Sequence, residues 1–250
     1  MMLQKIFKYF SLILIGGLVF HGSSMAKNDI DNSIYALLLK NHVKGHRVNY
    51  DGFKKDENLL DEYLAILSKT DAKALSGNKR FSFYINAYNA FTIKLVLTKF
   101  PGINSIKEIG GFFSNPWKKK FILLQGTVVS LDHIEHGILR PEFKDPRVHF
   151  AINCASKSCP PLLNKPFESN ILNYQLDGQT KKFINNPKNV FFKGDTLFIS
   201  KIFKWFKEDF SDNPIIFIKQ HADRELKEKL NGQKEDITLR YLDYDWSLNR

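Results

Sequence analysis

Residues 78–102, with the sequence NKRFSFYINAYNAFTIKLVLTKFPG, restrict the fold of this chain more than any other segment. Apolar side chains follow the helical period and also fill most of the positions between, so the predicted helix is apolar nearly all round. Such a helix is stable only when other elements cover every face, and we therefore expect it to lie buried at the centre of the molecule. Pro101 and Gly102 predict its end.

Shorter segments with helical and strand patterns alternate irregularly along the rest of the chain. Helical spacing and capping signals predict helices in residues 29–43, 57–69 and 130–140. Strand and turn signals predict a short strand at 48–50 before an Asp51-Gly52 turn, hairpins in 119–131 and 189–199, an interior strand at 147–153 and a last strand in 239–249. This mixture predicts the α+β class, with helices packed on a small, mostly antiparallel sheet.

Residues 1–26 have the order of a secretory signal peptide. Lys5 and Lys8 precede an apolar run at 10–20, and the small residues Ser24 and Ala26 occupy the two spaced positions that a signal peptidase reads. The apolar run is shorter than the about 20 residues that span a bilayer. We therefore expect cleavage before Lys27, a periplasmic or secreted protein, and no stable membrane span after cleavage.

Residues 27–250 contain no internal repeat, low-complexity tract or linker, which predicts a single domain. The formal charge of the full chain is +11, but its lysines are spread widely and the densest cluster is at 118–120. A nucleic-acid-binding protein gathers its basic residues in one patch or stripe. We expect no nucleic-acid partner and interpret the charge as solvated surface.

The two cysteines lie five positions apart in the segment HFAINCASKSCPPL, residues 149–162. An oxidising compartment permits a disulfide between Cys154 and Cys159, although so short a loop gains little stability from it. A zinc site fits poorly, because the C-x₄-C spacing is at the edge of the usual range and His133 and His136 are too close together for the usual histidine spacing. A nucleophilic thiol is the third interpretation, and the residues alone leave these alternatives open.

A reactive thiol needs a base and a group that orients this base. Asp132 and His136 lie four positions apart on the helix predicted for 130–140, so the carboxylate can reach the imidazole. His149 begins the segment that contains both cysteines.

Asn86 and Asn89 lie three positions apart on the central helix and therefore share one face. Buried amides need hydrogen-bond partners, most often in the backbone. We expect these two side chains to face the cysteine loop, where they either tie loops to the helix or shape a substrate site.

Six separated motifs occur in the order of a known family. They are FSFYINAYNAFTIKLVL, SIKEIGGFF…PWKKKF, SLDHIEHGILRP, RVHFAINCASKSCPPL, SKIFKWFKEDF and LRYLDYDWSLN. Over residues 45–248 the chain resembles the bacterial and plant family called domain of unknown function 547 (DUF547). The resemblance implies a papain- or transglutaminase-like core, in which an acid, a histidine and a cysteine converge, and thiol chemistry that involves glutathione.

Carried onto this chain, the resemblance assigns Cys159 as the nucleophile and His136 as its base. Asp132 is the acid that the helical spacing favours, and Glu57 and Glu62 are alternatives. The full set of candidate catalytic residues is Cys159, His136 and Asp132, with Cys154, His149, Asn86 and Asn89 as supporting or alternative residues.

We therefore predict an exported cysteine-dependent enzyme, either a hydrolase or an acyl or thiol transferase, that acts on a peptide-like or glutathione-like substrate. We expect Trp117 and Lys119 to bind the substrate, and we expect no metal ion and no cofactor, with glutathione only as a substrate. The alternative is a non-catalytic envelope binding module, in which Cys154 and Cys159 form a disulfide and Trp117 and residues 118–120 form the ligand surface.

Overall fold

The structure, a computed structural model, describes residues 30–110, 115–233 and 237–250. The predicted signal peptide at 1–26 and the predicted start of the mature chain at Lys27 lie outside these residues. Within the described ranges, no helix is both long and apolar enough to cross a membrane.

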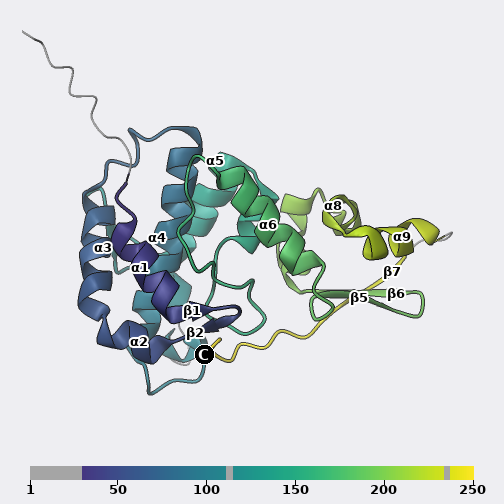
Figure 1. Cartoon of the computed structure of the whole chain (residues 1–250), viewed down its shortest axis with the longest axis horizontal. Coiled ribbons are helices and arrows are strands. Elements are labelled where there is room, and N and C mark those ends of the chain that lie inside the picture. Colours follow the sequence, from purple (N-terminus) through teal and green to yellow (C-terminus); the bar gives the residue numbers. More distant parts are fainter. Residues whose placement is uncertain (1–29, 111–114, 234–236) are drawn as a thin grey trace, which may run out of the picture.

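Four helices build the N-terminal half of the molecule (Figure 1). They are α1 (Ser33–His42), α2 (Tyr50–Lys55), α3 (Glu57–Lys69) and α4 (Gly77–Leu97). Helix α3 packs against both α1 and α4. In α4 every residue from Phe81 to Leu97 except Lys94 is buried, which confirms the central buried helix.

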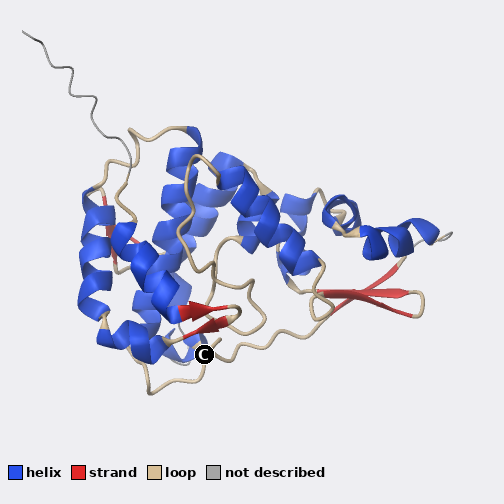
Figure 2. Ribbon diagram, viewed as in Figure 1, coloured by secondary structure: helices blue, strands red, loops and turns tan. Residues whose placement is uncertain are grey.

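Within the described residues, the strands form three small, separate sheets rather than one sheet beneath the helices (Figure 2). Two are antiparallel ribbons, β1 (Val43–Lys44) with β2 (Arg47–Val48), and β3 (Ile122–Leu124) with β4 (Thr127–Val129). The third contains β5 (Val190–Lys193), β6 (Thr196–Ile199) and β7 (Thr238–Tyr241), in which β5 and β6 are antiparallel and β6 and β7 are parallel. The α+β class and the mostly antiparallel pairing are confirmed.

The remaining helices of the described ranges are shorter on average. The α-helices are α5 (Arg140–Phe143), α6 (Leu172–Ile184), α7 (Ile202–Trp205), α8 (Pro214–His221) and α9 (Arg224–Gly232). The others are η1 (Ile106–Gly110), η2 (Pro116–Lys118), the π-helix η3 (His133–Leu139), η4 (Pro146–Phe150) and η5 (Lys207–Phe210).

Two local predictions are wrong. The segment 147–153 is not an interior strand, because Pro146 begins the short helix η4 and the Asp145 side chain accepts a hydrogen bond from the Arg147 backbone N–H. Proline fits the first position of a helix, and an apolar run does not by itself distinguish a buried strand from a buried helical turn. The Asp51-Gly52 pair lies inside α2 rather than in a turn, because Asn49 caps that helix.

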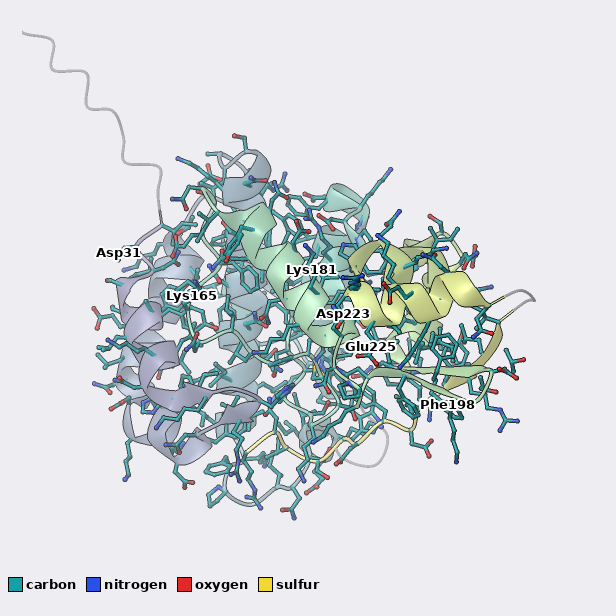
Figure 3. The ribbon with its side chains drawn as sticks, turned by 45° about the vertical axis from the view of Figure 1, so that its right-hand side comes forward. Asp31, Lys165, Lys181, Phe198, Asp223 and Glu225 are labelled. Carbon is teal, nitrogen blue, oxygen red and sulfur yellow. The ribbon has the colours of Figure 1, made fainter. Side chains whose placement is uncertain are left out.

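Two hydrophobic clusters share the interior of the described chain. The first gathers side chains of α1 to α4 and of the following loops, and the second gathers side chains of α6 to α9 and the three-stranded sheet. In Figure 3, Asp31 lies beside the N-terminal helices on one side of the molecule, and Phe198 lies on the strands at the other side. Val148 belongs to the first cluster and Phe150 to the second, so helix η4 joins them just before the cysteine loop.

Candidate active site

Helix α4 holds the start of the cysteine loop through one amide. Asn89 donates from Nδ2 to the Ala151 carbonyl at 3.0 Å and accepts at Oδ1 from the Asn153 backbone N–H at 2.8 Å. Asn86 makes the same kind of pair with the backbone of Phe167, at 2.9 and 2.8 Å. Both side chains therefore tie loops to the central helix, and Asn89 holds the residues directly before Cys154.

The loop itself folds around the Asn153 side chain. Its Nδ2 donates to the Pro160 carbonyl at 2.7 Å, and its Oδ1 accepts from the backbone N–H of Ala155 at 2.9 Å and from Asn249 Nδ2 at 3.2 Å. Ala155 has a φ of 64°, a left-handed conformation that turns the chain sharply between the cysteines. These contacts bring both sulfur atoms to the same place.

The C-terminal segment crosses the loop and adds side chains to it. The backbone N–H of Lys157 donates to the Ser247 carbonyl at 2.9 Å, and that of Ser158 donates to the Asp245 carbonyl at 3.2 Å. Through this crossing, Tyr244 comes within 3.2 Å of the Cys154 sulfur although 90 positions separate the two residues.

The two thiols are free and lie in contact, with 2.6 Å between their sulfur atoms. Cys159 Sγ accepts a hydrogen bond from the Cys154 backbone N–H at 2.8 Å. Cys154 Sγ has two further polar neighbours at 3.2 Å, the hydroxyls of Ser156 and Tyr244. Three possible donors thus converge on one sulfur atom.

The two thiols have pKa values displaced in opposite directions. Burial works against ionisation of Cys154, but hydrogen bonds from Cys159, Ser156 and Tyr244 outweigh it and lower the pKa of Cys154 to about 7. Burial and the neighbouring Cys154 sulfur raise the pKa of Cys159 well above its ordinary value. We therefore assign Cys159 as the S–H donor and Cys154 as the sulfur that ionises first.

Both sulfurs line a pocket of about 180 Å³. Its polar and ionisable lining includes Tyr88, Asn115, Asp132, Glu135, His136, His149, Cys154 and Cys159. Its aromatic lining is Trp117, Trp205, Phe206, Tyr244 and Trp246. A concave site with a few convergent polar groups and displaced pKa values is the usual form of an active site.

Glu135 is a buried carboxyl group in this pocket, with 8% of its surface exposed. It lies in the π-helix η3 and accepts a hydrogen bond from the Tyr88 hydroxyl of α4 at 3.0 Å. Burial is the main cause that raises the pKa of Glu135 to about 7, and the negative charge of a Cys154 thiolate adds to it. Single π-helical turns occur often at functional sites.

His149 and Asp209 form a hydrogen-bonded pair of ionisable side chains. Its Nε2 lies 2.6 Å from Asp209 Oδ2, and Arg140 donates to both oxygens of the same carboxylate, from Nε at 2.6 Å and from Nη2 at 3.1 Å. Burial lowers the pKa of His149, against the opposing effect of Asp209. His149 Nδ1 is buried and has no hydrogen-bond partner within the described part of the chain.

The residues first expected as base and acid also line the pocket but do not form the predicted pair there. His136 Nδ1 lies 2.8 Å from Arg140 Nη1, and no hydrogen bond between His136 and Asp132 is found among the described residues. Burial and the Arg140 charge lower the pKa of His136, while Asp132 raises it. The π-helical turn replaces the α-helical geometry on which the four-residue spacing relied.

Of the two residues expected to bind the substrate, only one lines the pocket. Trp117 lines the pocket, whereas Lys119 is exposed and does not. Glu57 lies away from the pocket, where it pairs with Lys54 and Lys94. In the ranges that the structure describes, no group of three His, Cys, Asp or Glu side chains is placed to hold a metal ion.

Several pocket residues were missed in the sequence. Glu135 is buried and lies directly before His136 in the helix predicted for 130–140. An acidic residue among the apolar positions of that helix was the sequence signal that could have identified it. Asp209 and Tyr244 lie inside two of the family motifs, but neither motif indicates a role for them, because only the tertiary fold brings them to the histidine and to the sulfur.

The family described as "Protein of unknown function, DUF547" matches residues 72–184. This range runs from just before α4 to the end of α6 and includes Glu135, His149 and both cysteines. It ends before Trp205, Asp209 and Tyr244, so these pocket residues lie outside the matched range. No curated protein and no solved structure matches the chain. The chain is therefore a DUF547 domain-containing protein.

Proposed function

We propose that this DUF547 domain-containing chain is a cysteine-dependent enzyme in which Cys154, rather than Cys159, is the attacking sulfur. The single observation that supports this most is the environment of the Cys154 sulfur, which has three possible hydrogen-bond donors inside a pocket. Since the thiolate is the reactive form, a group that ionises near neutral pH is ready to attack.

Thiol transfer is the reaction class that the geometry supports best. Among the described residues, no hydrogen bond joins Cys154 to a histidine, whereas a second sulfur lies 2.6 Å away. The Cys154 thiolate attacks one sulfur of a substrate disulfide R–S–S–R′, forms a Cys154–S–S–R mixed disulfide and releases R′–S⁻. Cys159 then attacks Cys154 Sγ and expels R–S⁻, which leaves a Cys154–Cys159 disulfide. A small external dithiol reduces this disulfide again.

Glu135 is suited to accept the proton of Cys159 before the second step. Its carboxyl group lines the same pocket, and the pKa of about 7 lets it hold or release a proton near neutral pH. Loss of the thiolate charge when the mixed disulfide forms makes Glu135 easier to ionise, because that charge is one cause of its raised pKa. The carboxylate then appears at the step that needs a base.

A papain- or transglutaminase-like hydrolase is the second candidate. His149 and Asp209 form a close pair at 2.6 Å, and the free Nδ1 of His149 belongs to a residue that lines the cysteine pocket. A histidine oriented by an acid is the pattern of a Cys–His–acid site. The backbone N–H of Cys154 is already bonded to Cys159, which removes one potential oxyanion donor.

For the substrate class and the cellular location, the proposal follows the predictions made from the sequence. We propose a small peptide-like or glutathione-like disulfide as the substrate, and export through the N-terminal signal. An exported protein meets an oxidising compartment, in which substrate disulfides are present. A non-catalytic binding module with a permanent disulfide is the competing description.

Trapping the mixed disulfide tests the proposed function. The reduced full chain is treated with glutathione disulfide and followed by intact mass and peptide mapping. We expect Cys159→Ser to accumulate glutathione on Cys154, Cys154→Ser to remain unmodified, and the unaltered protein to lose about 2 Da as its own disulfide forms. The two serine variants serve as matched controls for each other.

Three other outcomes would count against this function. Equal labelling of the two variants would remove the assignment of Cys154. A thioester probe that acylates Cys154 and is hydrolysed in a His149-dependent manner would favour the hydrolase. A native disulfide that resists mild reductant would favour the binding module.

A further inference from the structure

Four aromatic side chains from distant segments line the pocket. They are Trp117 of η2, Trp205 of α7, and Tyr244 and Trp246 of the C-terminal segment. The chain contains three tryptophans, and all three line this one pocket. Trp117 packs against the first hydrophobic cluster and Tyr244 against the second, whereas Trp205 and Trp246 are not among the residues of either cluster.

The rings touch one another and are not sealed from solvent. Trp205 lies 4.7 Å from Tyr244 and 5.6 Å from Trp246, between ring centroids, and Trp117 lies 5.6 Å from Trp246. Trp205 keeps 45% of its surface exposed. A cluster that served only to anchor the C-terminal segment would be expected to bury all three of its indole rings.

One ring face is already occupied, which limits where a ligand can lie. The Lys107 ammonium group lies 3.8 Å from the centroid of the Trp246 ring, in cation–π contact. Trp205 therefore offers the most exposed ring surface beside the sulfur atoms. A substrate bound in this pocket at Cys154 can therefore stack on the Trp205 ring.

We infer that the tryptophans form a subsite for a flat apolar ring, which the substrate carries next to the sulfur that Cys154 attacks. Aromatic faces stack favourably on flat rings, and their rigid side chains lose little conformational freedom on binding. The pocket thus prefers a ring-bearing disulfide over an open-chain disulfide. This inference rests on the proposed function, because it takes Cys154 as the attacking sulfur.

Two neutral disulfides test this preference. The second-order rate constants of the reduced full chain are measured with 4,4′-dithiodipyridine, which carries rings, and with bis(2-hydroxyethyl) disulfide, which does not. Each constant is divided by that of N-acetylcysteine with the same reagent, so that the intrinsic reactivity of the reagent cancels. The ratio of the two corrected constants is the ring preference.

We expect a ring preference above one, and we expect Trp205→Ala to lower it about 3- to 10-fold, the range that aromatic stacking gives. Trp205→Phe should restore part of it, because a smaller ring remains. Tyr174→Ala is the matched control, since Tyr174 is 77% exposed on α6 and does not line the pocket.

The two proposals fail in different ways in this experiment. A ring preference of one, or one that is equal in the unaltered protein and in Trp205→Ala, overturns the subsite whatever the absolute rates are. Rate constants for both reagents no higher than those of N-acetylcysteine count against Cys154 as an activated thiol. The ratio remains defined in that case and still decides the subsite.

Discussion

At the scale of single residues, the site places an acid and a thiol in one pocket with pKa values displaced toward each other. The pKa of Glu135 rises to about 7, above the ordinary value of a carboxyl group, and the pKa of Cys154 falls to about 7, below the ordinary value of a thiol. The hydroxyls of Tyr88 and Tyr244 are hydrogen-bonded to the two groups. Glu135 and Cys154 therefore both change their protonation state near neutral pH, where a catalytic acid or base is most effective.

Tyr244→Phe tests the hydrogen bonds to the reactive sulfur. Loss of the hydroxyl removes one bond that lowers the pKa of Cys154, so this pKa should rise by up to about one unit. Alkylation of Cys154 at pH 7 should then slow about 5-fold, as measured with iodoacetamide and peptide mapping. Tyr174→Phe, on the exposed side of α6, controls for loss of a hydroxyl and should leave the rate unaltered.

Glu135→Gln tests the buried carboxyl group through stability. Its pKa is raised in the folded protein, so the unfolded chain releases this proton at lower pH than the folded chain does. Stability from this group is therefore complete below about pH 4.5 and is lost as the pH rises to about 7. The glutamine variant lacks this loss.

The free energy of unfolding in urea gives the readout. Relative to the unaltered protein, Glu135→Gln should gain stability between pH 5 and pH 8, by an amount on the order of 3 kcal/mol. Glu208→Gln controls for removal of one negative charge, because 88% of the Glu208 side chain is exposed. An equal difference at pH 5 and pH 8 would contradict the raised pKa.

At the scale of elements, helix α4 holds the loops of the site in place through hydrogen bonds. Its two buried amides bind two different loops, Asn89 the segment before Cys154 and Asn86 the segment at Phe167. The two positions therefore form a matched pair, since both replacements break two buried hydrogen bonds in the same helix. Only one of them disturbs the cysteine loop.

Asn89→Leu and Asn86→Leu should each lower the free energy of unfolding by about 2–4 kcal/mol, as urea titration measures. Under conditions where both variants are folded, Asn89→Leu should shift the pH midpoint of Cys154 alkylation upward. Asn86→Leu should leave this midpoint in place. A midpoint that moves equally in both variants would show that the loop does not depend on Asn89 in particular.

The same elements explain how far the sequence alone could predict the fold. Helix α4 was predictable because its apolar character continues all round, and the two hairpins because Gly126 and Gly194 mark their turns with positive φ. The short helix η4 was not, because an apolar run of a few residues fits a strand and a helical turn equally well. The π-helical turn of η3, which sets where Glu135 and His136 point, leaves no pattern in the sequence.

At the scale of the whole molecule, the site lies where the two hydrophobic clusters meet and the C-terminal segment crosses the cysteine loop. The cysteines and both histidines came from local motifs and were predictable as candidates. Asp209, Tyr244 and Trp246 join them only through long-range packing, which no periodicity or spacing encodes. This is why the choice between the two cysteines required the tertiary structure.

Export is a prediction about the whole chain. The order of charged, apolar and small residues in 1–26 predicts a mature protein that begins near Lys27. Expression in a Gram-negative bacterial host, osmotic release of the periplasm and N-terminal sequencing measure this directly. Recovery of protein that still begins at Met1 from the periplasmic fraction would contradict the predicted cleavage.

The central claim is that Cys154 is the activated thiol of a two-cysteine site, and its most direct test is the pH dependence of alkylation at each cysteine separately. The reduced full chain is labelled briefly with iodoacetamide between pH 5 and pH 9, and each cysteine is quantified by peptide mapping. We predict that Cys154 reacts first, with a midpoint near pH 7, while Cys159 reacts slowly across this range. Faster labelling of Cys159, or two midpoints near the value of about 8.5 for a free thiol, would contradict the claim.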